Sequence, residues 1–210
     1  MAVRHAREQG AKVISICNTH GSTLPRESDA ALYTHAGPEI AVASTKAFLA
    51  QITAAYLLGL YLAQLRGNKY KDEIASILSE LQQMPEKIQK VIDNDAPVKE
   101  LGVEMKDASS VIFLGRHVGF PVAMEGALKL KEITYIHAEG FAAGELKHGP
   151  IALIDQGQPV IIVVPSASGR DSLHGKVVSN IQEVRARGAF TIVIAEEGDE
   201  AVKPYADRLI

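Results

Sequence analysis

The chain has 210 residues, with 22 lysines and arginines against 25 aspartates and glutamates, and a formal net charge of -3. Both signs are interspersed, so the sequence offers no basic surface and we expect no nucleic-acid partner. A hydrophobic fraction of 47% is sufficient for one large or two small α/β domains.

Cysteine content and the N-terminal sequence bear on the cellular compartment. Cys17 is the single cysteine, which excludes an internal disulfide framework and fits a reducing environment. No cationic, apolar leader is recognisable, so we expect a cytoplasmic protein. The most apolar stretch, 47–65, carries Gln51, Thr53 and Gln64, which favours a buried core helix over a membrane span.

The first third of the chain alternates between helical and extended patterns. Residues 2–9 predict a helix, 12–17 and 30–34 predict short strands, and 44–65 predict a long helix. This order is typical of parallel α/β layers. Because the chain starts in the middle of such a unit, we expect this first domain, over residues 1–66, to be partial.

A helical connector follows, and then the α/β pattern restarts. Residues 71–92 carry apolar side chains at helical spacing and predict an amphipathic helix interrupted at Pro85. We expect the connector to cover 67–100 and a nearly complete second domain to cover 101–210. That domain is predicted to be a parallel sheet with right-handed crossovers; its expected strands are 111–114, 160–164, 190–195 and 206–210, and its expected helices are 121–135 and 171–187.

Three loops lead into an expected helix; two of them follow an expected strand and the third follows the Gly37-Pro38 break in the chain. They are 115–117, 165–169 and 42–45, and such positions favour anions. For the last loop, a plain helix N-cap by Ser44 or Thr45 is the favoured explanation when the spacing is taken alone.

An unusual concentration of acid, base and imidazole groups lies within 125–150. Glu125, Lys129 and Glu132 share one face of the expected helix 121–135. Surface ion pairs and an acid/base pair that relays protons explain this spacing equally well. His148, before a Gly-Pro pair, is by itself more typical of a loop histidine, and its spacing from His137 gives little support for a metal site, so we expect none.

Four segments together carry a resemblance to a known family: 17–18, 26–29, 36–48 and 125–150 closely resemble the isomerase part of the glutamine–fructose-6-phosphate aminotransferases. The resemblance implies two sugar isomerase (SIS) domains of flavodoxin-like three-layer α/β architecture, with parallel sheets sandwiched between helices, one partial and one nearly complete here. It implies conversion of fructose 6-phosphate and ammonia into glucosamine 6-phosphate, with no cofactor, in a homodimer.

The same resemblance assigns roles to five residues. Glu132 resembles the base that moves a proton between C1 and C2, and Lys129 resembles a lysine that assists proton transfer at the sugar hydroxyls. His148 resembles the ring-opening histidine that reaches the site from the neighbouring subunit. Val42 and Ser44 resemble sugar contacts in the first SIS domain.

The sequence also departs from the family pattern. The family's Ser-Gln-Ser-Gly-Glu-Thr phosphate loop, its C-terminal tail with a Schiff-base lysine, and its glutaminase domain have no counterpart here. We therefore expect a fragment with little turnover by itself. The alternatives are an amino-sugar-phosphate deglycase or isomerase relative, and a non-catalytic sugar-phosphate-binding module.

Overall fold

The structure is a computed structural model that describes residues 1–168 and 172–210. It consists of two compact units, Met1–Ile92 and Asp93–Ile210, and the division falls inside the expected connector. Each unit has its own parallel sheet.

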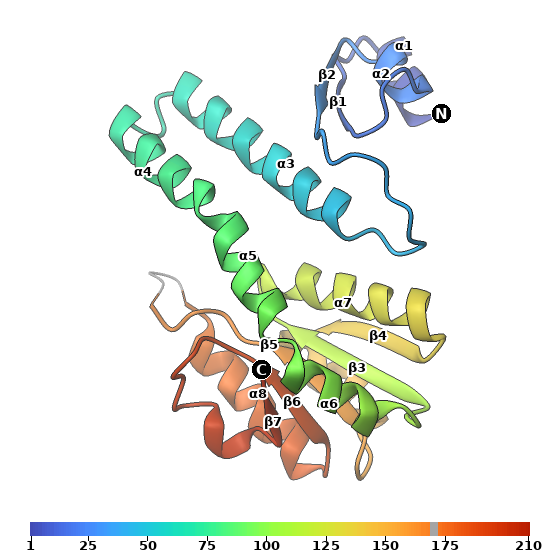
Figure 1. Ribbon diagram of the computed structural model, residues 1–210, viewed down its shortest axis with the longest axis vertical. Helices are drawn as coiled ribbons and strands as arrows, with labels where there is room; N and C mark the ends of the chain where they lie inside the picture. The colour runs from blue at the N-terminus through green and yellow to red at the C-terminus, as the bar shows by residue number, and fades with distance from the viewer. Residues whose placement is uncertain (169–171) are drawn as a thin grey trace. The chain divides into compact units, whose positions relative to one another are not determined.

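The first unit contains a small sheet and a series of helices (Figure 1). Strands β1 (Ile14–Cys17) and β2 (Ala30–Tyr33) pair in parallel, as the sequence predicts. Asp29 supports this pairing, since its carboxylate accepts the Val13 N–H at 2.9 Å. The helices of this part of the chain are α1 (Ala2–Glu8), α2 (Thr23–Glu27), α3 (Lys46–Leu65), α4 (Lys71–Gln82) and α5 (Met84–Asp93).

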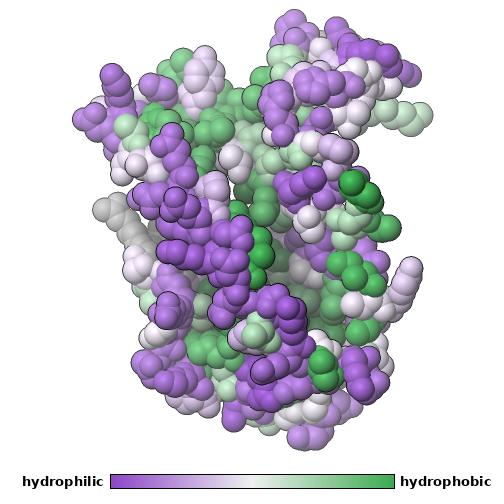
Figure 2. Space-filling model, in the orientation of Figure 1, coloured by the Kyte–Doolittle hydropathy of each residue, from purple (hydrophilic) through white to green (hydrophobic). Residues whose placement is uncertain are grey.

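Helix α3 differs from the buried core helix that the sequence predicts. Within it only Ala47, Ala54 and Leu60 are buried, whereas apolar residues such as Ile52 and Tyr61 are about half exposed. Figure 2 shows hydrophobic surface at the position of this helix. A sheet of two strands offers too little apolar area to cover twenty helical residues, which accounts for the difference. By length and composition alone α3 could also cross a membrane.

The amphipathic stretch after α3 forms two helices. The break lies at Gln83, between α4 and α5, and Pro85 is the second residue of α5. A proline is readily accommodated in the first turn of a helix, because the N–H groups there have no partner within the helix. The predicted interruption is therefore present, but it precedes the proline.

The second unit contains a parallel sheet with strand order β4-β3-β5-β6-β7. Helices α6 (Ala96–Met105) and α7 (Gly119–Thr134) pack on one face, and α8 (His174–Ala186) packs on the other. This arrangement confirms the predicted α/β class with parallel sheets between helices. The strands are β3 (Ser110–Gly115), β4 (His137–Ala142), β5 (Pro159–Val163), β6 (Phe190–Ile194) and β7 (Arg208–Leu209), and the short 3-10 helices are η1 (Ala143–His148), η2 (Pro150–Leu153) and η3 (Lys203–Tyr205).

The predicted helix 171–187 and the predicted loop 165–169 only partly overlap the described residues. The helix begins at His174, whereas the sequence predicts a start at Asp171. Asp171, and Gly169 of the predicted anion-binding loop, lie outside the described residues.

Gly115 holds the tight connection between β3 and α7. A Cβ atom at this position would lie 2.1 Å from the carbonyl oxygen of Gly119, which is part of the helix backbone. We expect Gly115→Ala to lower the free energy of unfolding by about 1–3 kcal/mol or more, because backbone must move. Gly102→Ala is the matched control: a Cβ there meets nothing within 4 Å, and alanine in a helix should stabilise by about 0.5–1 kcal/mol. Urea denaturation of both variants, followed by circular dichroism, tests the contrast; equal stabilities would contradict it.

The start of α8 is linked to the segment after β6 by a hydrogen bond between His174 and Asp199. His174 Nε2 lies 2.7 Å from Asp199 Oδ2, and the two side chains are 13% and 10% exposed. Burial acts to raise the pKa of Asp199, but the hydrogen bonds from His174 and the Ala201 N–H outweigh it, so the pKa lies below its ordinary value. The ionised Asp199 therefore stabilises the folded state. This stabilisation is fully present above the pKa that Asp199 has in the unfolded chain, and it is lost as the pH falls through the lower pKa of the folded protein.

His174→Ala is therefore expected to be destabilising at neutral pH and less so in acid. The variant leaves a nearly buried carboxylate without its imidazole partner, which costs about 1–3 kcal/mol at pH 7. At a pH below the lowered pKa of Asp199 the carboxylate becomes protonated, and the loss should shrink. His137→Ala is the control, since His137 and Glu139 pair at 3.6 Å with side chains 69% and 50% exposed. Denaturation midpoints at both pH values test this, and an equal loss at both would contradict a role for the Asp199 carboxylate.

Candidate active site

Helix α7 approaches the sheet closely because its inner face is made of small residues. Ala123 and Ala127 are buried against the sheet. A Cβ at Gly126 would lie 2.9 Å from the Phe113 ring, so glycine is required for this packing. The sequence thus places its small residues toward the strands and leaves the charged residues of the same helix on another face.

Three charged side chains form a cluster on that other face. Lys129 Nζ lies 2.7 Å from Glu132 Oε2 and 3.4 Å from Glu125 Oε1. All three side chains are half-buried, with exposures between 22% and 29%. The hydrogen bond with Glu132 is the main cause that raises the pKa of Lys129, so its ammonium form is retained. The structure therefore brings together Lys129, Glu132 and Glu125, the three residues that the sequence places on one helix face.

This cluster has the composition needed for proton transfer at a sugar. A carboxylate can take a proton from carbon, and an adjacent ammonium can stabilise or protonate an oxygen that becomes negatively charged. The partial exposure of Glu132 and Lys129 leaves them accessible to a ligand. The same geometry also fits a stabilising ion-pair group of a surface helix.

His148 lies at the end of η1 and is exposed, as predicted from the following glycine. Leu146 of η1 packs with Ile181 of α8, whereas Ala127 of α7 packs on the opposite face of the sheet. In the described part of the chain, His148 forms no hydrogen bond or ion pair with Glu132. Within one chain, the sheet of the second unit therefore lies between η1 and α7.

Val42 and Ser44 belong to the first unit and precede α3. Val42 is 89% exposed. Thr45 is the N-cap residue of α3, but neither Ser44 nor Thr45 forms the side-chain cap that the spacing favoured. Their hydroxyl groups donate instead to the carboxylate of Glu39, at 3.5 and 3.3 Å.

Glu39 takes the capping role at α3. Its Oε2 accepts the Ala47 N–H at 3.0 Å, and this hydrogen bond is the main cause that lowers the pKa of Glu39. Residue spacing did not single out Glu39, because it lies seven residues before the helix. The preceding Gly37-Pro38 turn was the available signal that the chain reverses there.

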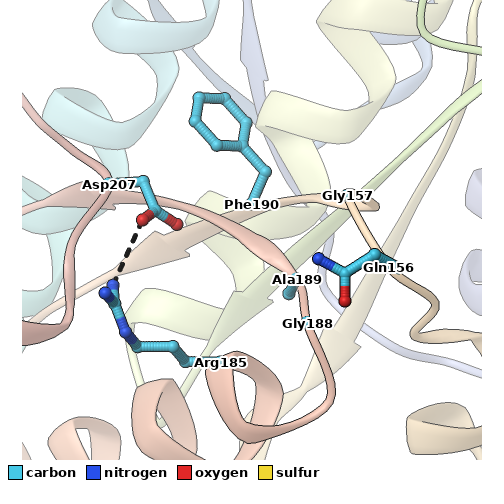
Figure 3. Close-up of a pocket in the computed structure, with 7 residues that line it drawn as sticks. All are labelled: Gln156, Gly157, Arg185, Gly188, Ala189, Phe190 and Asp207. Carbon is cyan, nitrogen blue, oxygen red and sulfur yellow. Dashed lines mark hydrogen bonds and ion pairs between the residues drawn. The ribbon is translucent and has the colours of Figure 1, made fainter.

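A cavity of about 370 Å³ lies in the second unit, at the edge of the sheet where the strands begin (Figure 3). It is bordered by Gln156, Phe190, Arg185 and Asp207, and Arg185 Nη1 pairs with Asp207 at 3.2 Å. Asp207 also accepts the Thr191 N–H at 2.8 Å. Ligands of parallel α/β sheets bind at the carboxyl ends of the strands, so we interpret these paired groups as structural.

The fold is that of an α/β protein with parallel sheets between helices, and α7 carries a charged face. Comparison with known families gives the family that has this fold. The chain belongs to the SIS domain family, which matches residues 1–61 and 104–210.

Within that class, the chain is similar over its whole length to a segment of proteins named glutamine–fructose-6-phosphate aminotransferase [isomerizing]. It is 78% identical to the protein of that name from Corynebacterium glutamicum and 66% identical to that from Streptomyces coelicolor. Both matches cover all of this chain and 34% of the relative, so the chain spans about a third of these proteins. A solved structure of the C-terminal domain of glucosamine-fructose-6-phosphate aminotransferase from Francisella tularensis is 41% identical, with a TM-score of 0.91, and the match covers 100% of this chain and 58% of that one.

Proposed function

We propose that this chain forms part of the sugar-phosphate isomerase half of a glutamine–fructose-6-phosphate aminotransferase. The full protein would convert fructose 6-phosphate and ammonia into glucosamine 6-phosphate. The observation that carries the proposal is the Glu125–Lys129–Glu132 cluster on α7, in a chain whose whole length matches about a third of these aminotransferases. A module that only binds a sugar phosphate has no need of a carboxylate paired with an ammonium.

The proposed chemistry assigns a separate step to each group. His148 opens the sugar ring by acid/base transfer at the ring oxygen and the anomeric hydroxyl. Ammonia condenses with the C2 carbonyl of the open chain and water leaves, which gives an imine at C2. Glu132 then removes a proton from C1 of this imine and delivers it to C2, while Lys129 assists transfers at the adjacent oxygen, and C1 becomes the aldehyde carbon of the product. Aldose–ketose conversion needs both kinds of catalyst, because ring opening and carbon deprotonation occur at different atoms. Val42 and Ser44 are proposed to contact the sugar.

We further propose a homodimer in which His148 serves the site of the partner subunit. Support comes from the second unit, where η1 and α7 lie on opposite faces of one sheet. A histidine of η1, on the opposite face of the sheet from α7 of its own chain, would then contact Glu132 of a second copy related by a two-fold axis. The expected location of this metabolic reaction is the cytoplasm.

A chimeric enzyme tests the proposed function. The 210-residue segment replaces the matching third of the Corynebacterium glutamicum relative, to which it is 78% identical. We expect this chimera to form glucosamine 6-phosphate from fructose 6-phosphate and glutamine at a rate within about tenfold of the parent. A folded chimera that binds fructose 6-phosphate without turnover would instead support a non-catalytic binding module, and deamination of glucosamine 6-phosphate alone would support the deglycase alternative.

A further inference from the structure

The direction in which His148 projects depends on how η1 is held. A 3-10 helix has about three residues per turn, so residues three apart in the sequence share a face. Ala143 and Leu146 form one face of η1 and are 1% and 0% exposed in the core of the second unit. Glu145 and His148 form another face and are exposed. Because such a short helix is not stable by itself, its contacts decide where His148 points.

The third face of η1 contacts polar side chains from two other elements. Gly144 lies against the guanidinium of Arg116, which belongs to the loop after β3; a Cβ at Gly144 would lie 2.8 Å from Arg116 Nη2. Lys147 Nζ pairs with Glu183 Oε1 of α8 at 2.9 Å. The glycine therefore allows Arg116 to lie directly on the backbone of η1.

Asn180 of α8 joins these two contacts. It is 6% exposed, and both ends of its amide are used. Its Oδ1 accepts from Arg116 Nη1 at 3.4 Å, and its Nδ2 donates to Glu183 Oε2 at 3.2 Å. Since Glu183 also pairs with Lys147, a continuous series of polar contacts runs from the loop after β3, through α8, to the residue before His148.

Burial indicates which of these contacts matter most. The Lys147 side chain is 67% exposed, so its ion pair with Glu183 contributes little by itself. Asn180 is buried and Arg116 is half-buried, and buried polar groups that lose a partner are costly because water does not replace it. Arg116 is also fixed through its backbone, since its C=O accepts the Gly119 N–H at the start of α7 at 2.8 Å. Arg116 and Asn180 therefore form the rigid part of the series.

We propose that Arg116 and Asn180 are positioning residues for His148. They hold the polar face of η1 against α8, and this contact, together with the buried face, fixes the rotation of η1 about its own axis. The imidazole is thereby directed away from the second unit, toward the site of the partner subunit. The inference rests on the proposed function, in which His148 opens the sugar ring.

Two substrates separate ring opening from the later steps in the chimeric enzyme. Fructose 6-phosphate must be opened, whereas 5-deoxyfructose 6-phosphate has no C5 hydroxyl with which to close a ring and does not need His148. We expect Arg116→Met to lower kcat for fructose 6-phosphate by about tenfold or more, and to change kcat for the deoxy substrate by less than about twofold. Asn180→Ala should give the same pattern. Formation of the amino-sugar product measures both rates.

Two further variants calibrate this comparison. His148→Ala should show the same selectivity with a larger loss, about 10²–10⁴-fold for fructose 6-phosphate, as expected for removal of an acid/base catalyst. Ser179→Ala is the matched control on α8: Ser179 is exposed, precedes Asn180, and donates its hydroxyl to the Gly175 carbonyl. It should alter neither rate.

A double variant tests whether Arg116 acts through His148. When His148→Ala is already present, adding Arg116→Met should lower the rate with fructose 6-phosphate no further, because residues that act as one unit are not additive. A further loss in that background would overturn the proposal, as would equal losses on the two substrates in Arg116→Met and Asn180→Ala. An unaltered chimera that turns over neither substrate would instead refute the proposed function itself.

Discussion

Glu132→Gln in the chimeric enzyme is expected to lower kcat for glucosamine 6-phosphate formation by about 10²–10⁴-fold, the usual contribution of one general base. The amide keeps the shape of the carboxylate but cannot accept a proton from C1. Binding of fructose 6-phosphate should change by less than about threefold, since the lost interaction acts in the transition state. Steady-state kinetics and a binding titration measure the two quantities.

Glu125→Gln is the matched control for this experiment. Glu125 lies on the same helix and contacts the same ammonium, 3.4 Å away rather than 2.7 Å. Its loss should lower kcat by less than about tenfold, because Lys129 retains Glu132 as its closer partner. Equal losses in the two variants, or an unchanged rate with Glu132→Gln, would show that Glu132 is not the base.

A mixture of two inactive chimeras is expected to regain activity. One carries His148→Ala and the other carries Glu132→Gln, and each alone lacks a group that every site needs. If His148 serves the partner's site, a mixed dimer combines Glu132 of the first chain with His148 of the second in one intact site. Random reassociation then restores about a quarter of the unaltered activity, because half of the dimers are mixed and each has one working site.

The mixing experiment also has a clear opposite outcome. If His148 acts within its own chain, both sites of the mixed dimer lack a group and no activity returns. Because η1 and α7 are on opposite faces of the sheet, we expect the first result. Mixing two preparations of the His148→Ala chimera controls for any effect of the reassociation procedure itself.

The elements that could be predicted from the sequence are those with strong local periodicity. The apolar β-branched runs around Val111, Val160 and Phe190 gave β3, β5 and β6 with boundaries close to those observed. Strand β4 was missed, because His137–Ala142 has one fully buried residue and reads as polar. It is an edge strand placed by its pairing with β3, and only the rule that a βα unit returns to a parallel strand could have indicated it.

The candidate site was predictable to the extent that it depends on helical spacing. Glu125, Lys129 and Glu132 share a helix face at any tertiary arrangement, so their contacts follow from the sequence alone. Residue spacing does not encode the paths of loops. It therefore could not predict that Glu39 caps α3, or that η1 lies on the face of the sheet opposite α7. The spacing does not distinguish an ion-pair group from a catalytic group, since both have the same geometry.

Proton NMR of the chimera and its Glu132→Gln variant in deuterated water, with fructose 6-phosphate and ammonia, tests the role of α7 most directly. We expect the unaltered chimera to convert the ketose to an aldose product or to exchange its C1 hydrogen for deuterium. The Glu132→Gln variant should bind the sugar phosphate and do neither. Conversion or exchange by that variant at the unaltered rate would contradict the assignment of proton transfer to α7.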